Sequence, residues 1–90
     1  MKTFNRRLWL NESNISSTGS IVCYSGKSAW TDKNTSKPVT IRFVEVADCH
    51  NKIRIHQSER ESLSDYVKKV ERMKNMLNEY QKFLETELLS

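Results

Sequence analysis

The sequence predicts an α+β fold, in which a small antiparallel sheet of about four strands is followed by one long C-terminal amphipathic helix. Two observations predict it. Apolar residues recur at alternating steps of three and four from residue 63 to residue 88, whereas residues 39–57 hold two segments in which apolar and polar side chains alternate. We expect a basic β-rich body at residues 1–61 and the helix at residues 62–90, within one domain overall.

The first two strands are expected before residue 25. In Phe4–Leu10, Phe4, Leu8 and Leu10 would share one face with Arg6, and Asn5, Arg7 and Trp9 would take the other. Asn11–Gly19 is rich in Asn and Ser and predicts a loop, and Ser20–Tyr24 is β-branched and aromatic enough for a second strand. We expect Ser25 and Gly26 to turn this strand, with Ala29 and Trp30 extending the hairpin briefly.

The strongest strand is predicted at Val39–Ala47, after a polar loop over Thr31–Pro38. Val39, Ile41 and Phe43 would share one face, and Thr40, Arg42, Val44 and Val46 the other. Asp48–Asn51 predicts a hairpin loop, and in the returning strand Lys52–Gln57 the residues Ile53 and Ile55 alternate with Lys52, Arg54 and His56.

The C-terminal helix is expected to begin after Ser62, whose hydroxyl can accept from a free backbone N–H, while Asp65 complements the helix dipole and lies within reach of Lys69. From Leu63 to Leu88 it would be roughly 40 Å long. Its heptad seam predicts a homodimer interface made of seven residues: Leu63, Tyr66, Val70, Met73, Leu77, Tyr80 and Leu84. Val67, Leu88, Met76 and Phe83 widen the stripe, so the alternative is that all of it packs on the chain's own sheet.

Positive charge is concentrated before the helix. The chain has 15 Lys and Arg against 11 Asp and Glu; residues 1–61 hold ten basic and six acidic residues, and residues 62–90 hold five of each. This division favours assembly through the helix and an anionic ligand on the body, with nucleic acid as the first candidate. The alternative is an ordinary lysine surplus on a solvated surface.

The predicted nucleic-acid-binding residues are basic or aromatic and lie on the expected strands: Arg7, Trp9, Arg42, Lys52, Arg54 and His56. Cationic groups neutralise phosphates, and Trp9, Tyr24 or Trp30 could stack on an unpaired base. The sequence lacks a helix-turn-helix or zinc-finger pattern, which favours RNA or single strands over duplex reading. The alternative is that Arg42 and Arg54 pair with Glu45 or only solvate the sheet.

No catalytic residue, metal site or cofactor is predicted. Cys23, Cys49, His50 and His56 lack the paired spacing of a zinc site, and two glycines are too few for a phosphate-binding loop. We expect both cysteines to be buried thiols. A metal-free ribonuclease toxin would need Glu45, His56 and an arginine such as Arg42 or Arg54, yet strand parity places Glu45 and Arg42 on opposite faces.

These observations predict a non-catalytic, small basic protein that binds RNA or single-stranded nucleic acid as a homodimer. The alternative is a protein-interaction module or inhibitor, such as a phage or plasmid antagonist of a host defence factor, with a protein target. The apolar run Leu8–Leu10 is too short for a signal peptide or a membrane span, so a cytoplasmic protein without membrane attachment is expected.

Overall fold

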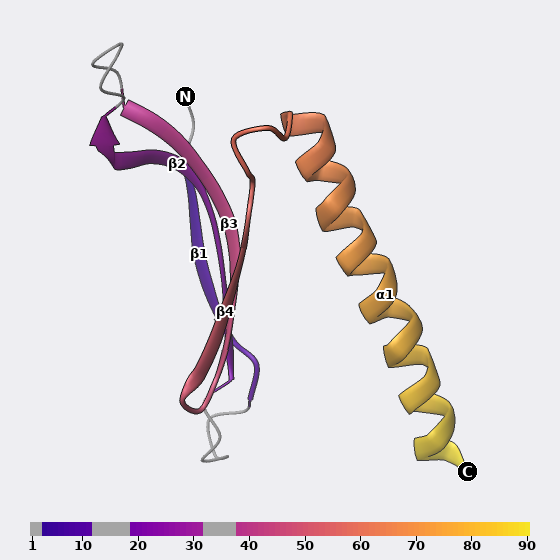
Figure 1. Ribbon diagram of the computed structural model, residues 1–90. Coiled ribbons are helices and arrows are strands. Elements are labelled where there is room, and N and C mark those ends of the chain that lie inside the picture. Colours follow the sequence, from indigo (N-terminus) through magenta and orange to yellow (C-terminus); the bar gives the residue numbers. More distant parts are fainter. Residues whose placement is uncertain (1–2, 12–18, 32–37) are drawn as a thin grey trace. The chain divides into compact units, whose positions relative to one another are not determined.

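The residues that the structure describes form four strands and one helix (Figure 1). The computed structural model describes residues 3–11, 19–31 and 38–90, and the side chains of residues 28–31 and 38 lie outside this description. Residues 1–57 and residues 58–90 form two compact units. The first unit contains β1 (Phe4–Trp9), β2 (Ser20–Thr31), β3 (Pro38–Asp48) and β4 (Asn51–His56), and the second contains α1 (Leu63–Leu89). The α+β prediction is confirmed.

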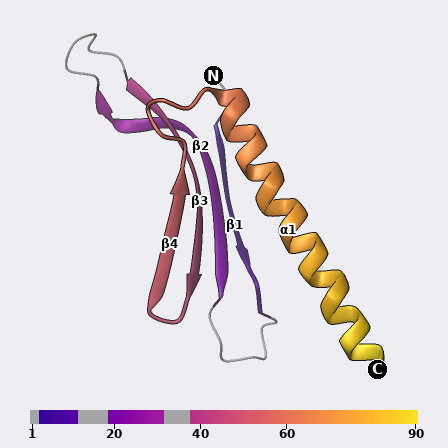
Figure 2. The same cartoon turned by 45° about the vertical axis from the view of Figure 1, so that its right-hand side comes forward.

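The four strands form one antiparallel sheet in the order β1-β2-β3-β4, so each strand pairs with its neighbour in sequence. Figure 2 shows them side by side, from β4 through β3 and β2 to β1. In this arrangement β1 and β4 are edge strands. Each edge strand carries two basic residues, which oppose pairing with a further strand.

The predicted turn at Ser25 and Gly26 is wrong, because β2 runs through both residues as one strand of 12 residues. A register shift between Lys27 and Thr31 marks an irregularity, and β2 bends near its end (Figure 1). The absence of a side chain at Gly26 leaves room for the Tyr24 ring. The Tyr24 hydroxyl donates to the Lys27 carbonyl at 2.8 Å, and a Cβ added at Gly26 would lie 2.9 Å from that hydroxyl oxygen.

The pairing register assigns the side chains to two faces, because residues opposite each other on paired strands point to the same side. The apolar face carries Phe4, Arg6, Leu8, Ile21, Cys23, Ser25, Arg42, Val44, Val46, Ile53 and Ile55. The aromatic face carries Asn5, Arg7, Trp9, Ser20, Val22, Tyr24, Phe43, Glu45, Ala47, Lys52, Arg54 and His56. The predicted alternation in β1, β3 and β4 is therefore confirmed.

A two-residue turn, Cys49 and His50, joins β3 to β4, with Asp48 opposite Asn51. The hairpin loop is thus where the sequence predicts it. Cys49 has a φ of 55°, the left-handed region that short hairpin turns require. Both cysteines are free: Cys23 is partly buried, but Cys49 is exposed. The expected burial of Cys49 is wrong because turn residues lie at the surface.

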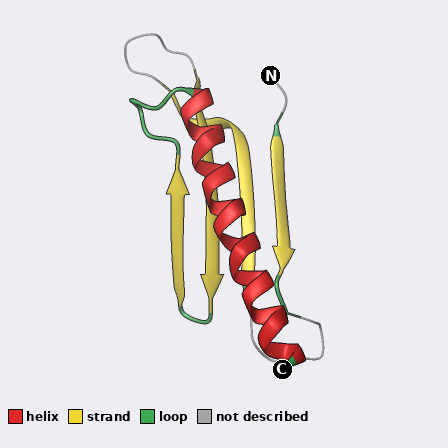
Figure 3. Ribbon diagram, turned by 90° about the vertical axis from the view of Figure 1, so that its right-hand side faces the viewer, coloured by secondary structure: helices red, strands yellow, loops and turns green. Residues whose placement is uncertain are grey.

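The start of α1 is fixed by two sets of contacts. Ser62 and Asp65 form a capping box, in which the Asp65 amide donates to the Ser62 hydroxyl at 3.1 Å and the Ser62 amide to the Asp65 carboxylate at 3.3 Å. Lys69 forms an ion pair with Glu61 and not with Asp65, whose carboxylate is already engaged by the cap. Glu61 also accepts from the Ser58 amide at 3.0 Å. Figure 3 shows α1 as one uninterrupted helix.

Candidate nucleic-acid interface

The aromatic face is built from three rows of side chains that cross all four strands. The first row is Asn5-Tyr24-Phe43-His56, the second is Arg7-Val22-Glu45-Arg54, and the third is Trp9-Ser20-Ala47-Lys52. Adjacent strands lie about 4.8 Å apart and rows about 7 Å apart. The rings of the first row therefore lie beside the two arginines of the second, on a surface about 14 Å on each side.

A ring cluster occupies the first row. Tyr24 and Phe43, opposite each other on β2 and β3, stack with their ring centroids 5.5 Å apart and an interplanar angle of 19°. The guanidinium of Arg54 lies over the Phe43 ring, 3.9 Å from its centroid. Such contacts at exposed sites contribute about 0.5–1 kcal/mol each. These contacts favour the stacked arrangement of the two rings and the arginine on this face.

Arg54 also forms an ion pair with Glu45, its cross-strand neighbour, at 3.0 Å. The side chain of Glu45 is 14% exposed and that of Arg54 is 52% exposed. Half of the Arg54 side chain therefore stays in contact with solvent, although one of its nitrogens is engaged. A ligand anion would meet this guanidinium beside a carboxylate, which weakens its contribution to phosphate binding.

The third row contains Trp9, whose ring is more exposed than those of Tyr24 and Phe43. Trp9 is 60% exposed, and the guanidinium of Arg7 lies over its ring at 5.7 Å from the centroid. Between Trp9 and Lys52 the row holds only the small side chains of Ser20 and Ala47. Lys52 is exposed and makes no ion pair with a residue in the described part of the chain.

Five of the six predicted binding residues lie on the aromatic face: Arg7, Trp9, Lys52, Arg54 and His56. The expectation that Arg42 lies beside them is wrong. The register places Phe43 opposite His56, so Arg42 is on the apolar face, where its guanidinium donates to the Gln57 side-chain oxygen at 2.9 Å. The Gln57 amide in turn donates to the Arg42 carbonyl at 2.9 Å. The alternative pairing with Glu45 holds for Arg54 only.

Tyr24 and Phe43 complete the aromatic face, and Phe43 was not among the predicted binding residues. The sequence signal that could have found Phe43 is the two-residue turn. A tight turn fixes the register of a hairpin, and this register places Phe43 beside Arg54 and His56. Trp30, a candidate stacking residue, lies in β2, but its side chain is outside the described residues.

The aromatic face also brings together Glu45, Arg54 and His56, which a metal-free ribonuclease would use. Glu45 is, however, engaged by Arg54, so a base at this position would first have to release an ion pair. Within residues 3–11, 19–31 and 38–90, no three metal-ligating side chains are grouped as a metal site would require.

The chain matches no known protein family, no curated protein and no solved structure. None of the helices in the described part of the chain has the length and apolar character needed to cross a membrane. The function is therefore inferred from the side chains of the aromatic face.

Proposed function

We propose that this protein is a non-catalytic nucleic-acid-binding protein, which binds RNA or other single strands on the aromatic face of its sheet and acts as a cytoplasmic homodimer. The observation that carries the proposal is the alternation of cations and rings on one face, with Arg7 over Trp9 and Arg54 over Phe43. Four-stranded sheets with exposed rings are a common platform for unpaired bases.

Each class of side chain on this face has a separate role in the proposal. Trp9 stacks on a base, whatever its identity, because every base has a π-face. Arg7, in the second row, and Lys52, at the opposite end of the third row from Trp9, neutralise phosphates on either side of that base. Arg54 covers Phe43 and presents the outer side of its guanidinium as a second stacking surface.

The test compares two double variants that remove the same charge from opposite faces. Arg7→Ala with Lys52→Ala removes two cations from the aromatic face, and Arg6→Ala with Lys27→Ala removes two from the opposite side of the sheet. Fluorescence anisotropy with a labelled 12-nucleotide single-stranded RNA measures the affinity at two salt concentrations. We expect the first variant to bind at least tenfold more weakly and to show a smaller salt slope, with the second close to the parent.

Equal losses in both variants would mean attraction by net charge alone and would contradict the proposal. Absence of RNA binding by the parent at low salt would also contradict it, and a protein retained on the tagged chain at high salt after nuclease treatment would then support the interaction module. Cleavage of the RNA that is lost in His56→Ala would make the same face a ribonuclease site.

A further inference from the structure

The stack of flat groups in the first row of the aromatic face ends at Tyr24. Tyr24 on β2 stacks with Phe43 on β3, and the guanidinium of Arg54 on β4 lies over the Phe43 ring. Because β3 lies between β2 and β4, Tyr24 and Arg54 reach Phe43 from the strands on its two sides. The next position of the row, on β1, is Asn5. The neighbour of Tyr24 on β1 is therefore an amide and not a further ring.

Asn5 and Tyr24 form one of the closer cross-strand pairs between β1 and β2. The Leu10 amide donates to the Gly19 carbonyl at 2.8 Å, so these two residues form a hydrogen-bonded pair. Hydrogen-bonded and non-hydrogen-bonded pairs alternate along antiparallel strands, and counting back from Leu10 places Asn5 and Tyr24 in a non-hydrogen-bonded pair. The Cα atoms of such a pair are about 4.5 Å apart, and its side chains are closer than in a hydrogen-bonded pair.

The side-chain amide of Asn5 is exposed and forms no hydrogen bond with any residue that the structure describes. The groups around it are engaged. The Tyr24 hydroxyl donates to the Lys27 carbonyl at 2.8 Å. The guanidinium of Arg7, the next residue of β1 on this face, lies over Trp9. An amide has a donor and an acceptor side by side and carries no charge, so it suits the edge of a base better than a phosphate.

We propose that Asn5 reads the edge of a base stacked on Tyr24 and gives the aromatic face a preference for adenine. This inference rests on the proposed binding of single strands, in which both edges of a base are accessible. All four bases have a donor beside an acceptor on the Watson–Crick edge. Only adenine repeats this arrangement on the Hoogsteen edge, where N6 donates and N7 accepts, so the amide can pair with adenine at either edge. Trp9 remains the stacking surface that accepts any base.

The test measures a ratio of affinities in the full chain, so that a general loss of binding cancels. Three labelled 12-nucleotide RNAs are compared by fluorescence anisotropy at one salt concentration: oligouridine, and the same strand with every third base replaced by adenine or by cytosine. We expect the parent to bind the adenine strand roughly fivefold more tightly than the other two. Asn5→Ala should bind all three strands alike, because the amide that distinguishes them is gone.

Two variants serve as controls. Asn51→Ala removes an exposed amide from the opposite side of the sheet, and Tyr24→Phe keeps the ring but removes the other polar group of this pair, so both should retain the preference for adenine. A preference that survives in Asn5→Ala, or one that is lost in either control, would overturn the role of Asn5. A parent that binds the three strands equally would overturn the base reading and leave the proposed binding of single strands intact, whereas absence of binding to all three would contradict both.

Discussion

The sheet and the helix both expose apolar and charged side chains, but they distribute charge differently. On the aromatic face of the sheet, cations are interleaved with rings, and Arg7 and Arg54 each lie over an aromatic ring. On α1, charge is separated along the length, with the basic residues mostly before residue 77 and the acidic residues mostly after it. Cations interleaved with rings suit a polyanion whose bases can stack, whereas the charges of α1 are not interleaved with rings.

The largest expected effect concerns the exposed ring of the sheet. Trp9→Ala should weaken binding of a single-stranded RNA by about 1–3 kcal/mol, because one base loses its stacking partner. Leu8→Ala is the matched control, since Leu8 is 55% exposed but lies on the apolar face. The affinities are compared by fluorescence anisotropy at one salt concentration. Equal losses in the two variants would mean that the ligand does not distinguish the faces.

The expected difference between Trp9 and Leu8 follows from strand alternation alone, and this part of the fold could be predicted from the sequence. The alternation in β1, β3 and β4 and the capped start of α1 are local patterns, and the structure confirms them. The placement of Arg42 failed for a different reason. Alternation assigns a residue to one side of its own strand, whereas the register decides which residues of the next strand share that side.

The continuity of β2 also could not be read from local pattern. Ser25 and Gly26 have the composition of a turn, and Gly26 lies instead where the Tyr24 ring needs space. That contact joins two residues on the same side of one strand, and it becomes visible only once the ring position is known. The ion pair of Lys69 with Glu61 is similar, because it depends on the path of the chain before the helix.

The second prediction tests whether the ring cluster of the sheet depends on that space. Gly26→Ala would place a Cβ 2.9 Å from the Tyr24 hydroxyl oxygen, so the ring must shift, and this shift strains its hydrogen bond to the Lys27 carbonyl. We expect a loss of roughly 1–2 kcal/mol in the free energy of unfolding, measured by urea denaturation. In a Tyr24→Ala background the same change should cost clearly less, because only the Thr3 methyl carbon, at 3.1 Å, then lies close to the added Cβ. An equal cost in both backgrounds would show that Tyr24 is not the obstacle.

The third prediction separates charge from ring contact at Arg54. Arg54→Lys keeps the positive charge but loses the flat guanidinium that covers Phe43, and we expect a loss of about 0.5–1 kcal/mol in the free energy of unfolding. A double-mutant cycle with Phe43→Leu should recover most of this loss as coupling between the two residues. Arg42→Lys, on the apolar face, should show no coupling to Phe43. Equal coupling at both arginines would remove the distinction between the faces.

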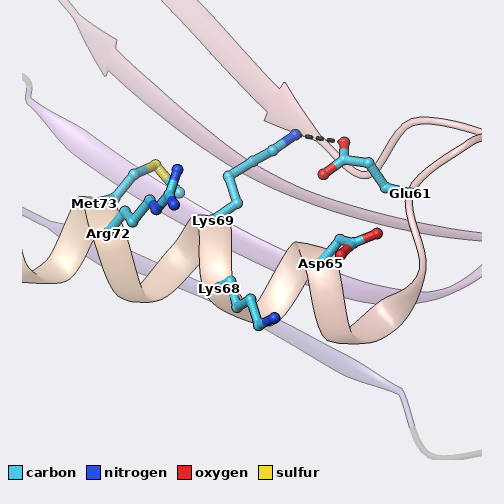
Figure 4. Close-up of a pocket in the computed structure, with 6 residues that line it drawn as sticks. All are labelled: Glu61, Asp65, Lys68, Lys69, Arg72 and Met73. Atoms are coloured by element: carbon cyan, nitrogen blue, oxygen red, sulfur yellow. Dashed lines mark hydrogen bonds and ion pairs between the residues drawn. The ribbon is translucent and has the colours of Figure 1, made fainter.

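The smallest expected effect concerns the ion pair between Glu61 and Lys69 at the start of α1 (Figure 4). The hydrogen bonds from Lys69 and from the Ser58 amide hold the pKa of Glu61 below its usual value. The ionised form is therefore the stabilising one. Its contribution is complete above the pKa of the unfolded chain and is lost as the pH falls through the lowered pKa of the folded chain.

Glu61→Gln should consequently lower the melting temperature at neutral pH, and the difference from the parent should disappear at the acidic end of a titration followed by the helix signal in circular dichroism. Glu79→Gln is the control, because Glu79 forms no ion pair with a described residue. A difference between Glu61→Gln and the parent that stays constant on acidification would mean that Glu61 acts through packing.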